Sequence, residues 1–458
     1  MFIGRETELN LLKTTINQNQ QAVMIYGKRK VGKTTLIQKA LEHISGKSFY
    51  FECLKSSLKD NLNLFSVELY RQKILPAKIN FDSWTDAFDF LNSLPEHLVV
   101  VIDEYPYLKN SKTEAEVDAI FQNIIDNRLG NMALILSGSH IGMMKSLLAE
   151  GNALYGRFTQ VIHLKELDYQ TCSEFYPDKS VYDRIGFYSV FGGSPYICSQ
   201  LDPTRSLKDN IIQGILNQNS MIYHYADNLL LSDYTNRVNA SRIFSAIGNG
   251  RERYKEIQNK LNIENNGSLS KQLKMLTDME IIQRNNPINR QDDPKKTTYE
   301  INDNLMRFYY SFVERNKSTL QIIGPENFYE QYVSPALTTF IAHRFEEICR
   351  DWFGLLARKG AIPGIRRIGS YYYDDAENHR NGEFDIALET ADGITLVEAK
   401  YLQNPLPISE QHKEIAQVHQ IKGLNINKIG FIAVNGFEEK IPGCFYATGE
   451  DLYETATI

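Results

Sequence analysis

Apolar runs without charge alternate with amphipathic stretches in the first part of the chain. Three of these runs are QAVMIY (21–26), HLVVVID (97–103) and MALILS (132–137). Short continuous apolar runs bounded by polar segments are typical of strands that are buried on both faces of a sheet. The pattern predicts an α/β domain, built on a parallel sheet with helices on both faces.

A different pattern follows near residue 236. Three short amphipathic helices are predicted first, and two strand-like pieces separated by a polar stretch come after them. Three helices followed by a β-hairpin is the order of a winged helix, so we predict such a domain over residues 236–334. The predicted segments are 236–250, 252–263 and 268–282 for the helices, and 281–285 and 298–303 for the strands.

The last part of the chain predicts a third domain over residues 335–458. LTTFIAHRFEEICRDWFGLL has apolar residues close to helical spacing, which predicts a helix with one buried stripe. Strand-like pieces IRRIGSYYYD, EFDIALET and ITLVEAKYL follow, then the helix SEQHKEIAQVHQIKGL and the strand KIGFIAV. The predicted order is therefore α-β-β-β-α-β.

Composition sets the broad class of the protein. The chain has 458 residues, 42% of them hydrophobic and 23% charged, which is typical of a globular protein of about three domains. It has no apolar run of roughly 20 residues and no signal-peptide layout at its start, so we expect a cytoplasmic protein with no membrane partner. Its five cysteines form no C-x-x-C pair, which makes a zinc site unlikely.

Charge is distributed unevenly along the chain. Residues 236–300 hold 12 Lys and Arg against 8 Asp and Glu, a net of +4, whereas residues 335–458 hold 12 against 18, a net of −6. The predicted third helix of the winged helix offers polar and basic side chains to a DNA major groove. Because an excess of four is small for a DNA-binding surface, packing of this module on the preceding domain stays open as the alternative. The side chains are those of Ser268, Ser270, Lys271 and Lys274.

The stretch MIYGKRKVGKTTLIQ (24–38) carries the first candidate chemistry, because it reads G-x-x-x-x-G-K-[ST] after a strand-like run. In such a turn backbone N–H groups converge on phosphate oxygens at the positive end of a helix dipole. We expect Lys33 to reach the β- and γ-phosphates of ATP, the Thr34 hydroxyl to ligate Mg²⁺, and Gly32 to allow close backbone approach. The predicted nucleotide-binding residues are Gly27, Lys28, Arg29, Lys30, Val31, Gly32, Lys33, Thr34 and Thr35. The three basic side chains at positions 28–30 have two possible roles: they lie in a solvated loop, or they contact a phosphate or a nucleic acid.

The strand HLVVVIDEYPYL (97–108) ends in two acids. Asp103 is expected to hold Mg²⁺ through water, and Glu104 to orient or polarise the water that attacks the γ-phosphate. Together with the glycine-rich turn, this pair predicts an ATPase that uses Mg²⁺.

A series of motifs makes a family resemblance specific. FIGRETELNLL, YGKRKVGKTTL, VVVIDEYPYL, LSGSHIGMM, LYGR and FGGSP occur in the order seen in the archaeal-type ATPase family, of the STAND branch of AAA+ P-loop proteins. The resemblance covers about the first 335 residues and implies an AAA+-type ATPase domain with a helical extension over residues 1–235. It implies that Ser139 senses the γ-phosphate, that Arg157 contacts it, and that Gly193 and Pro195 lie at the edge of the nucleotide. For Arg157, a solvated turn is the alternative.

The C-terminal α-β-β-β-α-β order with D…E-x-K resembles the PD-(D/E)xK nuclease superfamily. Asp385 falls in the second strand, and Glu398 and Lys400 share one face of the third. Asp385 and Glu398 can hold Mg²⁺, with Mn²⁺ possible in its place, and Lys400 can position a water. Glu346 on the preceding helix could complete the shell, with Glu347 as the alternative. The other interpretation of the strand pattern is a solvated sheet face.

Two hypotheses remain open. The first is an ATP-driven switch whose C-terminal domain is a restriction-endonuclease-like, metal-dependent DNA nuclease. The net negative charge of that domain counts against DNA cleavage, so the domain would need a local basic patch to hold DNA. Arg366, Arg367 and Arg380 could provide this patch. The second is a nucleotide-regulated interaction protein, with a nucleotide-dependent oligomer or a protein partner, whose C-terminal domain is an inactive binding module.

Overall fold

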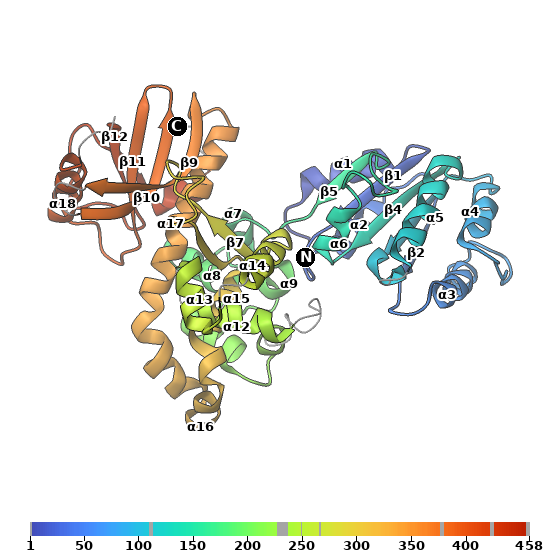
Figure 1. Cartoon of the computed structure of the whole chain (residues 1–458), viewed down its shortest axis with the longest axis horizontal. Helices are drawn as coiled ribbons and strands as arrows, with labels where there is room; N and C mark the ends of the chain where they lie inside the picture. Colours follow the sequence, from blue (N-terminus) through green and yellow to red (C-terminus); the bar gives the residue numbers. More distant parts are fainter. Residues whose placement is uncertain are drawn as a thin grey trace. The chain divides into compact units, whose positions relative to one another are not determined.

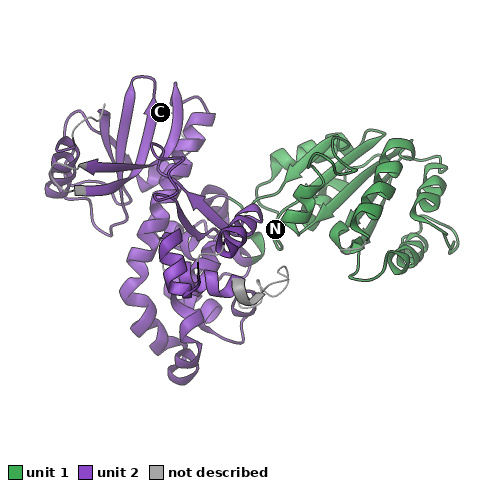
Figure 2. Ribbon diagram, viewed as in Figure 1, with its two compact units in different colours: residues 1–167, 194–196 green, residues 168–193, 197–458 purple. Residues whose placement is uncertain are grey.

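The computed structural model describes residues 2–109, 113–226, 237–248, 250–264, 267–375, 380–421 and 426–454. The chain divides into two compact units, one of residues 1–167 with 194–196, the other of residues 168–193 with 197–458 (Figure 2). The predicted domain boundary at residue 235 lies outside the described residues. The two units divide after Leu167, so the described helical segments between residues 168 and 226, apart from residues 194–196, cluster with the C-terminal part of the chain.

Unit 1 is built on a five-stranded parallel sheet in the order β2-β3-β4-β1-β5 (Figure 1). This is the predicted parallel sheet, and the three apolar runs form β1, β3 and β4. The strands are β1 Gln21–Tyr26, β2 Lys47–Glu52, β3 Leu98–Asp103, β4 Met132–Gly138 and β5 Gln160–His163. The helices are α1 Glu6–Ile16, α2 Lys33–Leu41, α3 Leu58–Arg71, α4 Trp84–Asn92, α5 Glu114–Asn127 and α6 Ile141–Ser146, with the 3₁₀ turn η1 Tyr105–Leu108.

Alternate residues of the strands in unit 1 point to opposite faces of the sheet, and each face buries a separate core. Val23, Val101 and Ile135 pack against α1 and α2 on one face. Met24, Val100 and Leu134 pack on the other face with aromatic side chains of α3, α4 and α5. Because both faces are covered, the central strands read as continuous apolar runs. The carboxyl ends of the parallel strands are left to form a site.

Unit 2 begins with a helical region, whose helices carry many aromatic side chains in their core. The aromatic stretch of residues 303–316 lies in this core, where Phe308, Tyr309 and Phe312 are buried. The segments before the next sheet are α7 Tyr169–Cys172, η2 Ser173–Phe175, α8 Val181–Phe191, α9 Pro195–Cys198, α10 Leu207–Asn210 and η3 Ile211–Leu216. Those after it are α15 Asn304–Phe308, η4 Tyr309–Val313, η5 Glu314–Asn316, α16 Lys317–Phe328 and η6 Tyr329–Val333.

Three helices and a hairpin follow each other in the predicted order within unit 2. The sheet β6-β8-β7 is antiparallel, and the two-residue strand β6 is an addition to the prediction. The elements are α12 Arg237–Ile247, β6 Glu252–Arg253, α13 Tyr254–Leu261, α14 Ser268–Asp278, β7 Ile282–Asn285 and β8 Thr298–Ile301. The identification of this module as a winged helix stays a prediction.

The C-terminal part of unit 2 holds the second five-stranded sheet, in the order β13-β12-β11-β10-β9. Strands β9, β10 and β11 pair antiparallel, and β11, β12 and β13 pair parallel. The predicted order α-β-β-β-α-β is observed, with β13 and α19 added. The elements are α17 Ser334–Arg358, β9 Ile365–Asp375, β10 Arg380–Thr390, β11 Gly393–Lys400, α18 Ile408–His419, β12 Ile426–Ala433, β13 Phe445–Thr448 and α19 Gly449–Tyr453. None of the helices in the described ranges has the length and apolarity needed to cross a membrane.

Candidate functional site

The glycine-rich turn between β1 and α2 needs its two glycines for different reasons. A Cβ on Gly27 would lie 2.1 Å from the carbonyl oxygen of Leu164, so only glycine fits there. Gly32 has φ +98° and precedes the first residue of α2, Lys33. The nearest atom to a Cβ on Gly32 would be Pro195 Cγ, at 3.9 Å. The left-handed backbone therefore favours glycine at position 32, and the expected close approach of this backbone to a phosphate stays a prediction.

Lys33 is buried at the start of α2, and its side chain folds back to the glycine-rich turn. Its Nζ donates to the carbonyl oxygens of Gly27 at 2.9 Å and Lys28 at 3.0 Å. Val31 is buried beneath the turn, whereas Thr34 and Thr35 are exposed in the first helical turn. The positive end of the α2 dipole and a lysine in the turn together favour a polyphosphate here.

Basic residues 28–30 are held by partners within unit 1, which decides against a purely solvated loop. Two of these contacts are polar, and the third places an ammonium group over an aromatic ring. Lys28 pairs with Glu166 at 3.2 Å, Arg29 donates to the Tyr107 hydroxyl, and Lys30 Nζ lies 4.3 Å from the centre of the Tyr196 ring.

The acidic end of β3 faces the turn. Asp103 Oδ2 accepts from the Thr34 hydroxyl at 3.0 Å and from the Tyr50 hydroxyl. Glu104 has φ +52°, and its Oε2 accepts from the backbone N of Ser139 at 3.1 Å and from the Ser139 hydroxyl at 2.8 Å. These contacts join residues that are 35 to 69 positions apart in the sequence.

Negative charge accumulates at this edge of the sheet. Burial, with Asp103 and Glu104, raises the pKa of Glu52. Burial, with Asp103, also raises the pKa of Tyr50. A divalent cation beside Asp103 would relieve this repulsion, and a carboxylate with a hydroxyl is the oxygen donor set that Mg²⁺ takes. Thr34 and Asp103 fit the ion and would hold it.

The two outlying predictions of unit 1 have different outcomes. Arg157 Nε donates to the Asp126 carboxylate at 3.0 Å in a partly exposed ion pair, and its contact with the γ-phosphate stays a prediction. Pro195 lies beside Gly32, because the neighbouring Ser194 hydroxyl donates to the carbonyl oxygen of Lys30 at 3.2 Å. Gly193 belongs to unit 2, and its role stays a prediction.

A second group of acids lies on the C-terminal sheet. Asp385 is on β10, at a shift in the register with β9 between Phe384 and Ala387, and such bulges re-aim side chains. Ile386 pairs with Val397, so the register continued by one residue sets Asp385 opposite Glu398 on β11. Lys400, two residues further along β11, pairs with Glu398 at 2.7 Å and with Glu414 of α18 at 3.4 Å.

Burial raises the pKa of Asp385 to about 7, with further increases from the Glu346 and Glu398 carboxylates. Burial also raises the pKa of Glu398, against the attraction of Lys400. The alternative residue Glu347 is instead held by Arg344, at 2.6 Å. These interactions favour Glu346 over Glu347 as the third acid and decide against a freely solvated sheet face.

Within the described ranges, no group of three or more His, Cys, Asp or Glu side chains is arranged to hold a metal ion. The carboxylates Glu346, Asp385 and Glu398 affect one another electrostatically, but they are not a formed metal site. Their oxygen donors suit Mg²⁺ or Mn²⁺ chemically. The C-terminal metal site therefore stays a prediction.

Comparison with known proteins bears on unit 1 first. Residues 2–201 match the family described as an ATPase domain predominantly from Archaea. This part of the chain is therefore similar to an archaeal-type ATPase domain. Residues 309–416 match a second family, described as archaeal and bacterial proteins of unknown function. The segment that matches the ATPase family contains the glycine-rich turn, the acids at the end of β3 and Ser139.

Three similar proteins extend this comparison. An uncharacterized protein of Methanocaldococcus jannaschii is 29% identical over 411 residues, which is 88% of each chain. An uncharacterized ATP-binding protein of the same organism is 46% identical over 44 residues, 9% of this chain and 75% of that one. The structure of a Walker-type ATPase of Pyrococcus abyssi has a TM-score of 0.51 at 18% identity, and covers 68% of this chain and 96% of that chain. The last likeness shows a shared fold.

Several residues of both sites were not predicted from the sequence. In the ATPase domain, Tyr50 reaches Asp103 only because β2 pairs with β3, with Tyr50 opposite Val101. On the C-terminal sheet, Glu414 reaches Lys400 across the β11–α18 connection. A tyrosine near the end of a strand and an acid on an amphipathic helix are common, so no local sequence signal marks either residue.

Proposed function

We propose that this protein is a switch driven by ATP binding and hydrolysis in its archaeal-type ATPase domain. The observation that carries the proposal is the pairing of two contacts, Thr34 with Asp103 and Glu104 with Ser139. The first contact brings together the oxygen donors for Mg²⁺, and the second anchors an acid on the neighbouring strand. An acid held in this way can orient a water toward the γ-phosphate.

Each residue has a distinct part in the proposed reaction. Lys33 and the N-terminus of α2 bind the phosphates, and Lys33 then exchanges its carbonyl partners for phosphate oxygens. Thr34 and Asp103 would hold Mg²⁺, which would supply positive charge to neutralise the phosphates. Glu104 accepts a proton from the attacking water or orients it, while Ser139 holds the carboxylate in place.

The test separates nucleotide binding from hydrolysis. Lys33→Ala should abolish ATP binding in a titration with a fluorescent ATP analogue. Glu104→Gln should retain binding and lower the hydrolysis rate about a hundredfold or more, because the amide cannot take the proton. Glu96→Gln, at an exposed ion pair with Lys47, is the matched control and should keep the parental rate. Hydrolysis at the parental rate by both site variants would refute the proposal.

A second candidate function concerns the C-terminal sheet, as a metal-dependent nuclease acting on DNA. The observation that favours it is the placement of Asp385 at a register shift opposite Glu398, next to the paired Lys400. Two carboxylates could hold Mg²⁺ or Mn²⁺, and Lys400 would stabilise charge on the phosphate. The competing account is an inactive module that binds a partner under nucleotide control.

DNA cleavage with Mg²⁺ or Mn²⁺, with and without ATP, distinguishes the two accounts. Asp385→Ala and Lys400→Ala should both lose cleavage, whereas Asp392→Ala, at the exposed β10–β11 turn, should keep it. Asp385→Ala should also weaken Mn²⁺ binding, measured by titration calorimetry, and Lys400→Ala should not. If the parent neither cleaves DNA nor binds metal at this site, the interaction module is the better account.

A further inference from the structure

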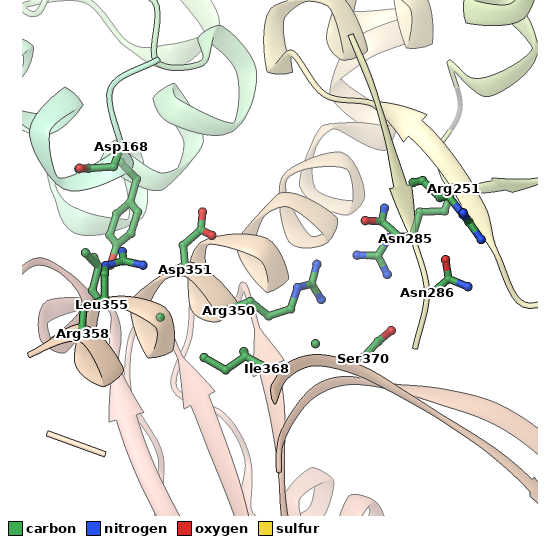
Figure 3. Close-up of a pocket in the computed structure, with 14 residues that line it drawn as sticks. Asp168, Arg251, Asn285, Asn286, Arg350, Asp351, Leu355, Arg358, Ile368 and Ser370 are labelled. Atoms are coloured by element: carbon green, nitrogen blue, oxygen red, sulfur yellow. The ribbon is translucent and has the colours of Figure 1, made fainter. Parts of the chain in front are cut away.

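Unit 2 contains a cavity of about 610 Å³ between α17, β9 and the side of β7 (Figure 3). Arg350 and Asp351 project from α17, and Asn285, Asn286 and Arg251 lie on the opposite side. Its lining is mainly polar. The lining residues are Asp168, Tyr169, Arg251, Arg284, Asn285, Asn286, Arg350, Asp351, Gly354, Leu355, Arg358, Ile368, Gly369 and Ser370.

The arginines of this cavity are not equivalent. Arg251 is surrounded by glutamates, with Glu300 at 3.6 Å and Glu346 at 3.8 Å, so its charge is matched by the protein itself. Arg284 on β7 and Arg358 at the end of α17 are exposed. These two, with Arg350, give the cavity guanidinium groups that a ligand can reach.

The acids of the cavity offset only part of this charge. Asp168 caps α7 by accepting from the backbone N of Thr171 at 2.8 Å. Asp351 faces the water of the cavity but is surrounded by protein, and this desolvation, with nearby Glu347, raises its pKa to about 6. Four arginines and two acids line the cavity; Arg251 is matched by glutamates and Arg350 lies 4.0 Å from Glu347, so Arg284 and Arg358 carry most of its accessible positive charge.

The spacing of the arginines indicates the kind of anion. Arg350 and Arg358 are eight residues apart on α17, which is about 12 Å along the helix axis. Arg284 comes from a different sheet. A single phosphate group cannot meet all three guanidinium groups, whereas the successive phosphates of a strand can, and arginine is well suited to phosphate oxygens.

The cavity also adjoins the second candidate site. Arg350 NH1 donates to the backbone oxygen of Asp385 at 2.8 Å, and Arg251 lies 3.8 Å from Glu346 and from Glu383 of β10. A strand held by Arg350 would therefore pass near Asp385.

We propose that this cavity binds the phosphate backbone of a nucleic-acid strand, with Arg284, Arg350 and Arg358 as its phosphate contacts. Asn285 and Asn286 also line the cavity, and their amide nitrogens donate to Glu300 and Thr297. The proposal deepens the nuclease-like candidate function, since it names the surface that would hold the substrate. Binding itself needs neither cleavage nor ATP.

The test measures binding of a fluorescein-labelled 15-nucleotide single-stranded DNA to the full chain by anisotropy, in EDTA and without nucleotide. Arg284→Gln combined with Arg358→Gln should raise the Kd about tenfold or more and lessen its salt dependence, because two phosphate contacts are lost. Arg290→Gln combined with Lys359→Gln removes the same charge from exposed neighbours outside the cavity lining, and should change the Kd less than about twofold. Equal midpoints of thermal unfolding show that both double variants fold.

A second probe distinguishes a strand from a small phosphate. Pyrophosphate binding is measured in a Lys33→Ala background, so that the ATP site does not contribute. If pyrophosphate binding depends on Arg284 and Arg358 while DNA binding does not, the cavity holds a small anion and the strand proposal is overturned. It is also overturned if the parent does not bind DNA at low salt, or if both double variants bind DNA as the parent does. The DNA-binding assay contains neither metal nor ATP. Its result therefore does not depend on whether the protein hydrolyses ATP or cleaves DNA.

Discussion

Glu104 shows how a single residue is prepared for chemistry. A non-glycine residue at φ +52° is uncommon, and such backbone strain persists only where the surroundings hold it in place. Here Ser139 holds the side chain through two hydrogen bonds, and the buried Tyr105 follows in η1. The strain and the anchor together aim a carboxylate that would otherwise be free at the end of a strand.

Ser139→Ala should lower kcat for ATP hydrolysis about tenfold and leave KM nearly unchanged, because the hydroxyl positions Glu104 and not the nucleotide. Steady-state kinetics over a range of ATP concentrations checks this split. Ser137→Ala is the control on the same strand, since its buried hydroxyl has no hydrogen bond among the described residues. A higher KM with unchanged kcat in Ser139→Ala would mean that the serine contacts ATP instead.

Asp385 predicts a pH dependence of stability. Its pKa of about 7 lies above the value near 3.9 of an unfolded aspartate, so between these values the folded state holds the extra proton. Stability should therefore fall as the pH rises from about 4 to 7. Asp385→Asn should increase the free energy of unfolding by up to about 2 kcal/mol at pH 8 and flatten the curve. Denaturant unfolding in EDTA at pH 5 and pH 8 measures this, and an unchanged slope would contradict it.

At the scale of elements, a buried polar group ties the segment after Glu104 to α5. Lys109 Nζ lies 2.5 Å from Asp118, and the Tyr105 hydroxyl donates to the same carboxylate at 2.8 Å. Asn152, in the loop that leads to Arg157, donates to the other oxygen at 2.9 Å. One aspartate on α5 therefore orders both η1 and a distant loop.

Lys109→Met should destabilise the ATPase unit by about 3 kcal/mol, because it leaves the buried Asp118 charge without its cation. Adding Asp118→Leu to this variant should recover part of the loss, since the unpaired charge is then removed. Thermal unfolding followed by circular dichroism ranks the three proteins. A double variant less stable than Lys109→Met would show that the contacts of Asp118 with Tyr105 and Asn152 matter more.

At the scale of the whole molecule, the chain crosses between its two units more than once. Residues 194–196 belong to unit 1, although the residues before and after them belong to unit 2. Within unit 1 this segment contacts the glycine-rich turn, through Ser194 with Lys30 and through the Tyr196 ring. We therefore expect a change at the phosphates to reach α8 and the rest of α9 through this segment of the chain.

Tyr196→Ala should weaken this coupling and leave ATP binding within about threefold, since one cation–π contact is lost. The measurement is hydrogen exchange across Val181–Phe191, with and without a non-hydrolysable ATP analogue. The parent should show a nucleotide-dependent change in protection, and Tyr196→Ala a smaller one. Tyr155→Ala removes an exposed tyrosine of unit 1 and is the control. An equal change in all three proteins would exclude this route.

The order of the helices and strands could be predicted from the sequence, because the spacing of apolar residues within a segment indicates which of its faces are buried. The strands of the ATPase sheet that are covered on both faces appear as apolar runs, and the amphipathic helices α12, α13, α14 and α17 have one buried stripe. The glycine-rich turn could be predicted as well, since its chemistry lies within nine consecutive residues. Asp103 and Glu104 were found because they end an apolar strand.

Partners that lie far apart in the sequence were decided by tertiary structure alone. Tyr50 meets Asp103 through strand pairing, Arg157 pairs with Asp126, and Gly32 has a left-handed backbone that the sequence alone does not show. Arg284, Arg350 and Arg358 line one cavity only because β7 and α17 both border it, and Arg367 of the predicted basic patch is paired with Glu389. Local sequence fixes which face of an element is buried, whereas the contacts between elements depend on register and packing that no single segment encodes.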